Sequence, residues 1–188
     1  MKTLIKAVCF VLFFCGAGIP MSADRGSLGT VKISYVLHRI PDIASNQVAV
    51  WIEDESGNYV KTLFATRFSA RGGFKKRPQS LPEWVKVSNW KNASPAEVEA
   101  VSGATQKEGT VELIWDCTDK NGKPVAAGNY VYKIEGNIFW NDRVVWQGRI
   151  AVSGTRNSSS AQPAYFPDDA AEKGALIEQV QAVFEPLR

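Results

Sequence analysis

The sequence predicts an all-β protein, an antiparallel β-sandwich interrupted by one long irregular excursion that contains a short helix. Three observations support this prediction. Apolar residues recur at every second position in several short segments, as in strands that bury one face. Glycine, asparagine and aspartate cluster between these segments, as they do in tight turns. No long helical patterns alternate with the strands, which argues for a sandwich over a parallel sheet.

The N-terminus has the pattern of a signal peptide, which we expect to span residues 1–23. Lys2 and Lys6 precede an apolar run, residues 7–20, that is short for a membrane span. Met21-Ser22-Ala23 then provides a cleavage site. The short run disfavours the alternative, an uncleaved anchor. We therefore expect a periplasmic or secreted protein that does not itself span the membrane after cleavage.

The mature chain, residues 24–188, is long enough for one domain with a sizeable core. The signal peptide carries two lysines and no acid, so its removal lowers the formal net charge from +3 to +1. This balance offers no basic field for nucleic acid. Cys117 is the only cysteine left, so the domain has no internal disulfide and packing must stabilise it.

The first strands are predicted over residues 31–37, 48–52 and 59–64. In the first, apolar residues alternate with Lys32 and Ser34, and in the second Val48, Val50 and Ile52 mark every second position. Residues 54–58, Asp-Glu-Ser-Gly-Asn, form a turn between the second and third segments, so these two strands are expected to pair as a hairpin.

Residues 65–109 form the long excursion, because they show little clean alternation. Within it, Ser94-Pro95-Ala96-Glu97 indicates a helix start, with an N-cap serine, proline at the first helical position and an acid three residues after the cap. A short helix to about Ala100 would deliver residues 102–105 at its C-terminal end. Long excursions in compact domains are often functional.

A second pair of strands is predicted over residues 111–115 and 130–134, with Trp115 on the apolar face of the first. The polar turn 116–123 between them contains Asn121-Gly122, a pair that tolerates positive φ. We expect this strand pair to lie at the centre of the scaffold.

The C-terminal part is predicted to add a strand over residues 144–152, after a turn at 140–143. Residues 155–162 are rich in serine and asparagine, which predicts a flexible segment. Residues 175–184 fit either a helix face or a strand. We favour a strand, because the domain is otherwise β and a last strand can cover a sheet edge.

No catalytic or metal constellation is visible in the sequence. His38 is the only histidine, so it cannot form a histidine cluster, and it is expected on the polar face of the first strand. Cys117 has no nearby base and no nucleophile elbow surrounds a serine. The turn after Cys117 lacks the first and twelfth ligands of a calcium loop. We therefore expect no metal and no enzymatic activity.

Two tryptophans and a basic run within the excursion are candidates for a binding surface. Trp84 and Trp90 could line a ligand surface, although covering one end of the sandwich is the more common role for such residues. Lys75-Lys76-Arg77 could bind an anion, and its simpler interpretation is a solvated loop.

Ser102-Gly103-Ala104-Thr105 is the stretch in which we look for chemistry. Its structural interpretation is a tight turn between helix and strand, with Gly103 supplying permissive backbone angles.

The sequence resembles a known family. Three motifs are similar to those of the DUF2271 family of predicted periplasmic proteins. They are the seven residues EAVSGAT from Glu99, the pattern WDxTDxNG from Trp115 and the pattern GxY from Gly128. The resemblance covers residues 31–152. Its second half also resembles the immunoglobulin-like module of flagellar hook-capping proteins, which implies an Ig-like sandwich and no common chemistry.

Ser-Gly-Ala-Thr is also similar to the site at which a flavin transferase joins FMN to extracytoplasmic electron-transfer proteins. The resemblance implies that the hydroxyl of Thr105 forms a phosphoester with FMN, with Ser102, Gly103 and Ala104 around it. Two positions depart from that motif. Glu99 stands where aspartate is usual, and Lys107 stands where serine or threonine is frequent.

Two functions from different classes follow. The leading one is an electron carrier or accessory subunit that presents covalent FMN on Thr105 to a membrane redox protein, with Trp84 and Trp90 available to stack on the flavin ring. The alternative is a cofactor-free Ig-like binding or structural module of the cell envelope, with Trp84, Trp90 and residues 75–77 as its contact surface.

Overall fold

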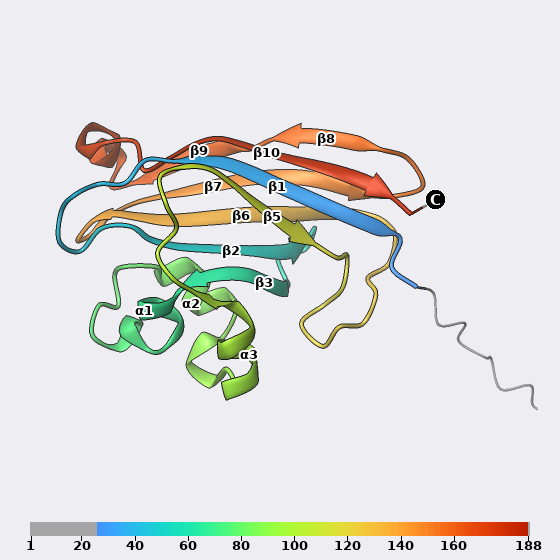
Figure 1. Cartoon of the computed structure of the whole chain (residues 1–188), viewed down its shortest axis with the longest axis horizontal. Helices are drawn as coiled ribbons and strands as arrows, with labels where there is room; N and C mark the ends of the chain where they lie inside the picture. The colour runs from blue at the N-terminus through green and yellow to red at the C-terminus, as the bar shows by residue number, and fades with distance from the viewer. Residues whose placement is uncertain (1–25, 188) are drawn as a thin grey trace, which may run out of the picture.

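A computed structural model describes residues 26–187 as a sandwich of two β-sheets, with a group of short helices against one of them (Figure 1). The all-β sandwich predicted from the sequence is confirmed. The expected signal peptide, residues 1–23, lies outside the described residues.

One sheet has four strands in the order β5-β1-β10-β8, and every neighbouring pair in it is antiparallel. Its members are β1 (Gly29–Leu37), β5 (Gly109–Trp115), β8 (Asn157–Ser160) and β10 (Ile177–Pro186).

The other sheet has six strands in the order β4-β3-β2-β6-β7-β9. Its members are β2 (Gln47–Asp54), β3 (Tyr59–Thr66), β4 (Ser102–Gly103), β6 (Gly128–Phe139), β7 (Asp142–Val152) and β9 (Gln162–Phe166). All pairs are antiparallel except β3 with β4, which is parallel. A short 3₁₀ helix, η3 (Asp168–Lys173), joins the sheets before β10.

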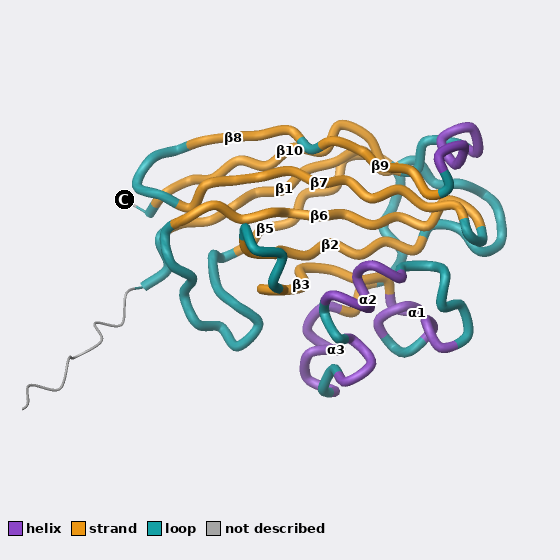
Figure 2. Tube along the Cα trace, turned by 180° about the vertical axis from the view of Figure 1, so that it is seen from behind, coloured by secondary structure: helices purple, strands orange, loops and turns teal. Residues whose placement is uncertain are grey.

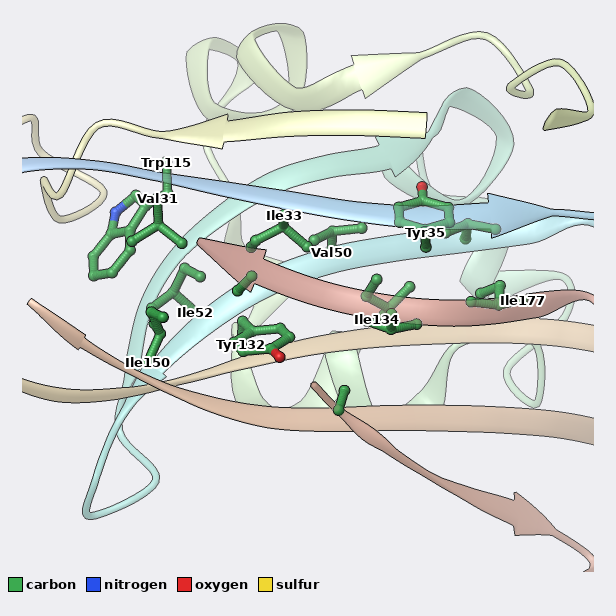
Figure 3. Close-up of a cluster of buried hydrophobic side chains, with 14 of the residues drawn as sticks. Val31, Ile33, Tyr35, Val50, Ile52, Trp115, Tyr132, Ile134, Ile150 and Ile177 are labelled. Carbon is green, nitrogen blue, oxygen red and sulfur yellow. The ribbon is translucent and has the colours of Figure 1, made fainter. Parts of the chain in front are cut away.

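The main core lies between the sheets and is built from the alternating residues that the sequence pattern identified (Figure 3). Ile33 and Tyr35 of β1 are fully buried against residues such as Ile52 of β2 and Ile134 of β6. Because strand side chains alternate between faces, one sheet face is apolar and meets its counterpart.

A second core lies on the outer face of the six-stranded sheet, where the excursion packs (Figure 2). The excursion holds five short helices in place of the single one expected: α1 (Arg67–Ala70), η1 (Gly73–Lys75), α2 (Pro82–Val87), η2 (Trp90–Asn92) and α3 (Pro95–Val101). Trp51 of β2 is buried beneath them, so the central part of β2 is buried on both faces.

The start of α3 is the predicted capping box. The Ser94 hydroxyl accepts a hydrogen bond from the Glu97 backbone N–H, and the Glu97 carboxylate accepts one from the Ser94 N–H at 2.9 Å. Pro95 occupies the first helical position. This reciprocal bonding fixes where the helix begins, and therefore where residues 102–105 emerge.

The predicted pairing of residues 111–115 with residues 130–134 is wrong, although both strands are present. β5 pairs with β1 in the four-stranded sheet, whereas β6 lies between β2 and β7 in the six-stranded one. The polar turn 116–123 therefore crosses between the sheets. β5 is consequently an edge strand of the four-stranded sheet and not a central strand of the scaffold.

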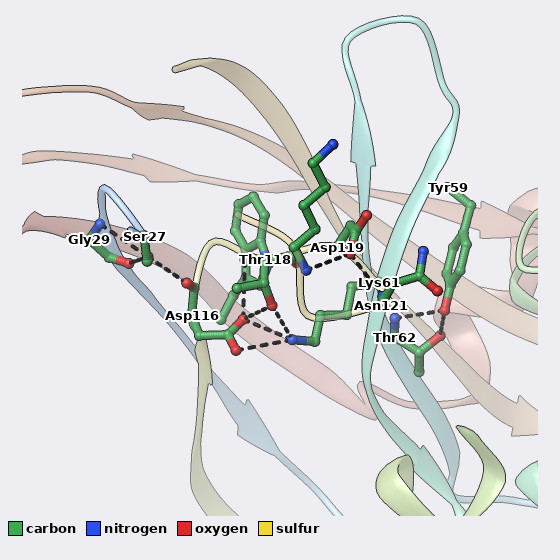
Figure 4. A network of polar contacts seen from close by, with 11 residues as sticks. Ser27, Gly29, Tyr59, Lys61, Thr62, Asp116, Thr118, Asp119 and Asn121 are labelled. Atoms are coloured by element: carbon green, nitrogen blue, oxygen red, sulfur yellow. Dashed lines mark hydrogen bonds and ion pairs between the residues drawn. The ribbon is translucent and has the colours of Figure 1, made fainter. Parts of the chain in front are cut away.

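Polar contacts hold this crossing turn against β3 (Figure 4). Lys61 Nζ lies 2.8 Å from Asp116 Oδ1 and 2.6 Å from Thr118 Oγ1. Asp119 Oδ1 accepts hydrogen bonds from the backbone N–H groups of Asn121 and Lys123 at 2.8 and 2.9 Å. The aspartate side chains thus stabilise a turn, as the composition predicted, but a turn that joins two layers.

The C-terminal third contains one further correction. Residues 157–160 form β8, where the serine-rich composition predicted a flexible segment, because their backbone pairs with β10. The favoured strand at residues 175–184 is confirmed as β10. It lies between β1 and β8 and does not cover an edge, so Phe184 is fully buried.

Candidate functional site

The Ser-Gly-Ala-Thr motif lies where α3 ends and the chain turns toward β5. Ser102 and Gly103 form β4, a two-residue strand that pairs in parallel with Ala65 and Thr66 at the end of β3. The motif is therefore not a simple turn, because its first half is fixed to the edge of the six-stranded sheet.

Gly103 is required here for a different reason from the one the sequence suggested. Its φ angle is not in the positive region. Instead, a Cβ at this position would overlap the ring of Phe64. The absence of a side chain lets β4 approach β3 closely, so that the chain leaves the sheet in a fixed direction.

Ala104 and Thr105 follow in an irregular segment and are both exposed. The next residue, Gln106, is anchored, because its Oε1 accepts a hydrogen bond from the Tyr35 hydroxyl at 2.6 Å. Burial raises the pKa of Tyr35 above its ordinary value, so this hydroxyl stays a donor. Thr105 is thus presented at the surface between two fixed points, β4 and Gln106.

Positive charge lies beside the motif. Arg71 Nη2 pairs with Glu99 Oε2 at 2.6 Å, and Arg71 Nε lies 3.4 Å from Ser102 Oγ. Both charged side chains are more than half exposed, so the pair contributes little stability. Lys107 is also exposed. Glu99, the position that departs from the usual aspartate, therefore has a partner in this structure.

Trp84 and Trp90 do not lie on a surface. They are 0% and 4% exposed, and their ring centroids are 4.7 Å apart in the second core. Their indole N–H groups donate to Thr62 Oγ1 at 3.0 Å and to the Ala70 carbonyl at 2.9 Å. Both residues hold the excursion on the sheet, so the prediction that they line a ligand surface is contradicted.

The residues that sequence reasoning missed form a charged cluster beneath α2. Lys133 of β6 is nearly buried and lies 2.8 Å from Glu83 Oε1 and 3.2 Å from Glu53 Oε2. Burial alone would lower the pKa of Lys133, but these two carboxylates raise it above its ordinary value. The lysine therefore ties α2 to the sheet as a cation.

Glu135, two residues further along β6, is fully buried. Its carboxylate accepts hydrogen bonds from the backbone N–H groups of Trp84 at 2.9 Å and Glu83 at 3.4 Å, and Arg143 Nη1 lies 3.5 Å away. Burial raises the pKa of Glu135 to about 7, and the two N–H groups and Arg143 oppose that shift. The signal for this cluster was present in the sequence, where charged Lys133 and Glu135 alternate with apolar neighbours on a strand.

A groove of about 610 Å³ opens beside the cluster. Its lining includes Pro82, Glu83, Lys86, Lys133 and Arg143. Lys133 in this groove pairs with both Glu53 and Glu83, and we assign the cluster to holding α2 in place.

The remaining candidates are structural. His38 Nε2 lies 2.8 Å from Glu178 Oε2 at the surface just beyond β1. Burial raises the pKa of the Cys117 thiol to about 12, so it is a poor nucleophile. Among residues 26–187, no group of three histidine, cysteine or acidic side chains is placed to hold a metal ion.

The helices in the described part of the chain are all too short or too polar to cross a membrane. Comparison with protein families matches residues 30–165 to the family described as "Predicted periplasmic protein (DUF2271)". No curated protein and no solved structure matches the chain. The family match covers well over half of the sequence, and the chain therefore belongs to the DUF2271 family of predicted periplasmic proteins.

Proposed function

We propose that this periplasmic protein is a non-catalytic electron carrier that bears FMN covalently on Thr105. A flavin transferase would attach the FMN, and a membrane redox protein would exchange electrons with it. The observation that carries the proposal is the position of Thr105, which is exposed in an irregular segment between two anchored points.

The surroundings of Thr105 suit a bulky group on its hydroxyl. A transferase needs an accessible hydroxyl on a segment that can enter its active site, and residues 104–108 have no regular structure. Ala104 adds only a methyl group beside the acceptor. Gly103 is held against Phe64, so the segment leaves the sheet at a fixed place and the attached group would stay near β4.

Charge at the site also suits a phosphoester. The donor would be flavin adenine dinucleotide: Thr105 Oγ bonds to the phosphorus that bears the riboflavin, the pyrophosphate P–O bond breaks and AMP leaves. Thr105 loses its hydroxyl proton in this step, and the diester that forms carries one negative charge. Lys107 is exposed two residues away, whereas Arg71 at the other end of the motif is already paired with Glu99. A lysine this close to an exposed phosphate would favour it modestly, as is usual for solvated charge pairs.

The FMN would supply one- and two-electron transfer, chemistry that belongs to the cofactor and not to the protein. Because Trp84 and Trp90 are buried, ring stacking by these residues is not part of the proposal. The chain's role is to hold the attachment point, keep it exposed and set the charge around it.

The test is the intact mass of the protein co-expressed with a flavin transferase. The wild type should gain the mass of one FMN less one water, and Thr105→Ala should show no such gain while keeping the far-UV circular dichroism of the parent. Thr105→Ser should retain some labelling, because it keeps a hydroxyl. Thr110→Ala is the matched control, since Thr110 is an exposed threonine on the adjoining β5 and should not affect labelling.

The two departures from the usual motif sharpen this test. Glu99→Asp with Lys107→Thr should raise the labelled fraction. If the wild type and this double variant both stay unlabelled beside a transferase that labels a known substrate, the flavin proposal is wrong. The cofactor-free binding module would then replace it.

A further inference from the structure

Exposed apolar side chains gather at one end of the sandwich around a single guanidinium. The Cζ atom of Arg77 lies 5.9 Å from the ring centroid of Phe68 and 5.7 Å from that of Trp140. Its Nη2 donates to the Ala44 carbonyl at 2.6 Å, next to Ile43. Arg77 therefore joins three separate segments: the β1–β2 loop, α1 and the β6–β7 turn.

The apolar residues of this end lie on protruding segments. Ile43 in the β1–β2 loop is 86% exposed, and Trp140 at the tip of the β6–β7 turn is 48% exposed. Both of these connections lie at the same end of the molecule (Figure 1). Phe68 is 41% exposed, and Phe139 adjoins Trp140 with ring centroids 6.3 Å apart. Exposed apolar side chains that gather in one place are a feature of interaction sites.

Positive charge accompanies these side chains. Residues 67–77 contain five lysines and arginines and no acid. Lys75 and Lys76 are exposed, as are Arg67 and Arg71. The acidic helix η3 lies at the same end but on the opposite side from α1 (Figure 2). We refer to Ile43, Phe68, residues 75–77 and residues 139–140 together as the basic-aromatic end.

We propose that the basic-aromatic end docks on an anionic lipid surface. Tryptophan favours the membrane interface, phenylalanine and isoleucine insert their apolar side chains below it, and clusters of lysine and arginine are attracted to anionic headgroups. The apolar residues lie on three separate segments that protrude from this end, which suits insertion into a lipid surface.

This docking is independent of the flavin proposal, but the two fit together. Arg71 belongs to the same basic segment and lies beside Ser102, so a docked molecule would hold the Thr105 segment close to the bilayer. A protein with no spanning helix among its described residues would then stay near a membrane partner through two weak signals, charge and aromatic insertion.

The experiment measures co-sedimentation of the unlabelled mature protein with vesicles of phosphatidylcholine, with and without phosphatidylglycerol. Binding should require phosphatidylglycerol and fall as salt rises. A Lys75→Gln, Lys76→Gln variant should bind about 25-fold more weakly, given roughly fivefold per cation near such a surface. Trp140→Asn, which suits the positive φ at this position, should also weaken binding.

The matched control is Lys120→Gln with Lys123→Gln, which removes two exposed lysines from the turn at the other end of the sandwich. It should bind like the wild type, and so should Thr105→Ala, which separates docking from flavin attachment. Absence of binding to phosphatidylglycerol vesicles would overturn the proposal. Equal weakening by both lysine pairs would do the same, because it would mean that only net charge matters.

Discussion

Replacing Glu135 by glutamine should change how the stability of the protein depends on pH. The side chain is fully buried on β6 and accepts hydrogen bonds from two backbone N–H groups at the start of α2. Glutamine has nearly the same shape and keeps one acceptor oxygen, but it does not titrate. The comparison therefore isolates the ionisation of one buried carboxyl.

The magnitude follows from the difference in pKa between the two states. Burial raises the pKa of Glu135 from 4.5 to about 7 in the folded protein. At 1.36 kcal/mol per pKa unit, the ionised form costs about 3 kcal/mol of stability. The pKa of Glu135 is higher in the folded protein than in the unfolded one. The contribution of the protonated side chain to the free energy of unfolding is therefore fully present below pH ~4.5 and is lost as the pH rises to about 7.

Urea unfolding followed by tryptophan fluorescence at a series of pH values measures this difference. The wild type should lose about 3 kcal/mol relative to Glu135→Gln between pH 4.5 and pH 7, and the gap should then stay constant. Glu112→Gln is the control, because Glu112 pairs with Lys32 at the surface and is half exposed. Parallel pH profiles for the wild type and Glu135→Gln would refute the reasoning.

Two further predictions concern packing. Trp115 is fully buried, donates to the Thr118 carbonyl at 2.8 Å and meets Tyr130 edge to face, so Trp115→Ala should lower the free energy of unfolding by about 3–5 kcal/mol. The exposed neighbour Ile114→Ala should change it by less than ~0.5 kcal/mol, and equal losses would contradict the assigned face. Gly103→Ala should cost about 1–3 kcal/mol in chemical denaturation, because the new methyl group meets Phe64. At Gly154 an added methyl group meets open space, so Gly154→Ala should be nearly neutral. Phe64→Leu should recover part of the stability that Gly103→Ala loses. A lack of any recovery would mean that the contact with Phe64 is not the cause of the loss.

The positions of the longer strands were predictable because their apolar residues recur at every second position. All six strands predicted by alternation are present, and the capping box at Ser94 was correct because it depends only on residues close in sequence. Pairing was less predictable. A polar turn such as 116–123 looks the same whether it closes a hairpin or joins two sheets, since the choice depends on distant contacts such as Lys61 with Asp116.

The candidate site was predictable only in part for the same reason. The exposure of Thr105 could be predicted from the small and polar residues next to it in the sequence. The role of Gly103 could not, because it depends on Phe64, a residue far away in the sequence. The packing of Trp84 and Trp90 against the outer face of the sheet could not be predicted, because nothing in the local sequence shows that the excursion has a core of its own. Burial on both faces of β2 was the missing information, and it is visible in the sequence only as the near-continuous apolar run 48–52.

The position of β2 between two cores also determines how the molecule opens. Its inner face supports the sandwich, and its outer face carries Trp51 beneath the excursion. Unfolding α2 and η2 would expose Trp84 and Trp90 as well as the outer face of the six-stranded sheet. The backbone amides of these two helices should therefore exchange hydrogen with solvent only on global unfolding. Helix α3, in contrast, has no fully buried residue and can fray at little cost. The motif after α3 therefore lies at the boundary between a cooperative unit and a loosely held one, where an enzyme could reach it without unfolding the domain.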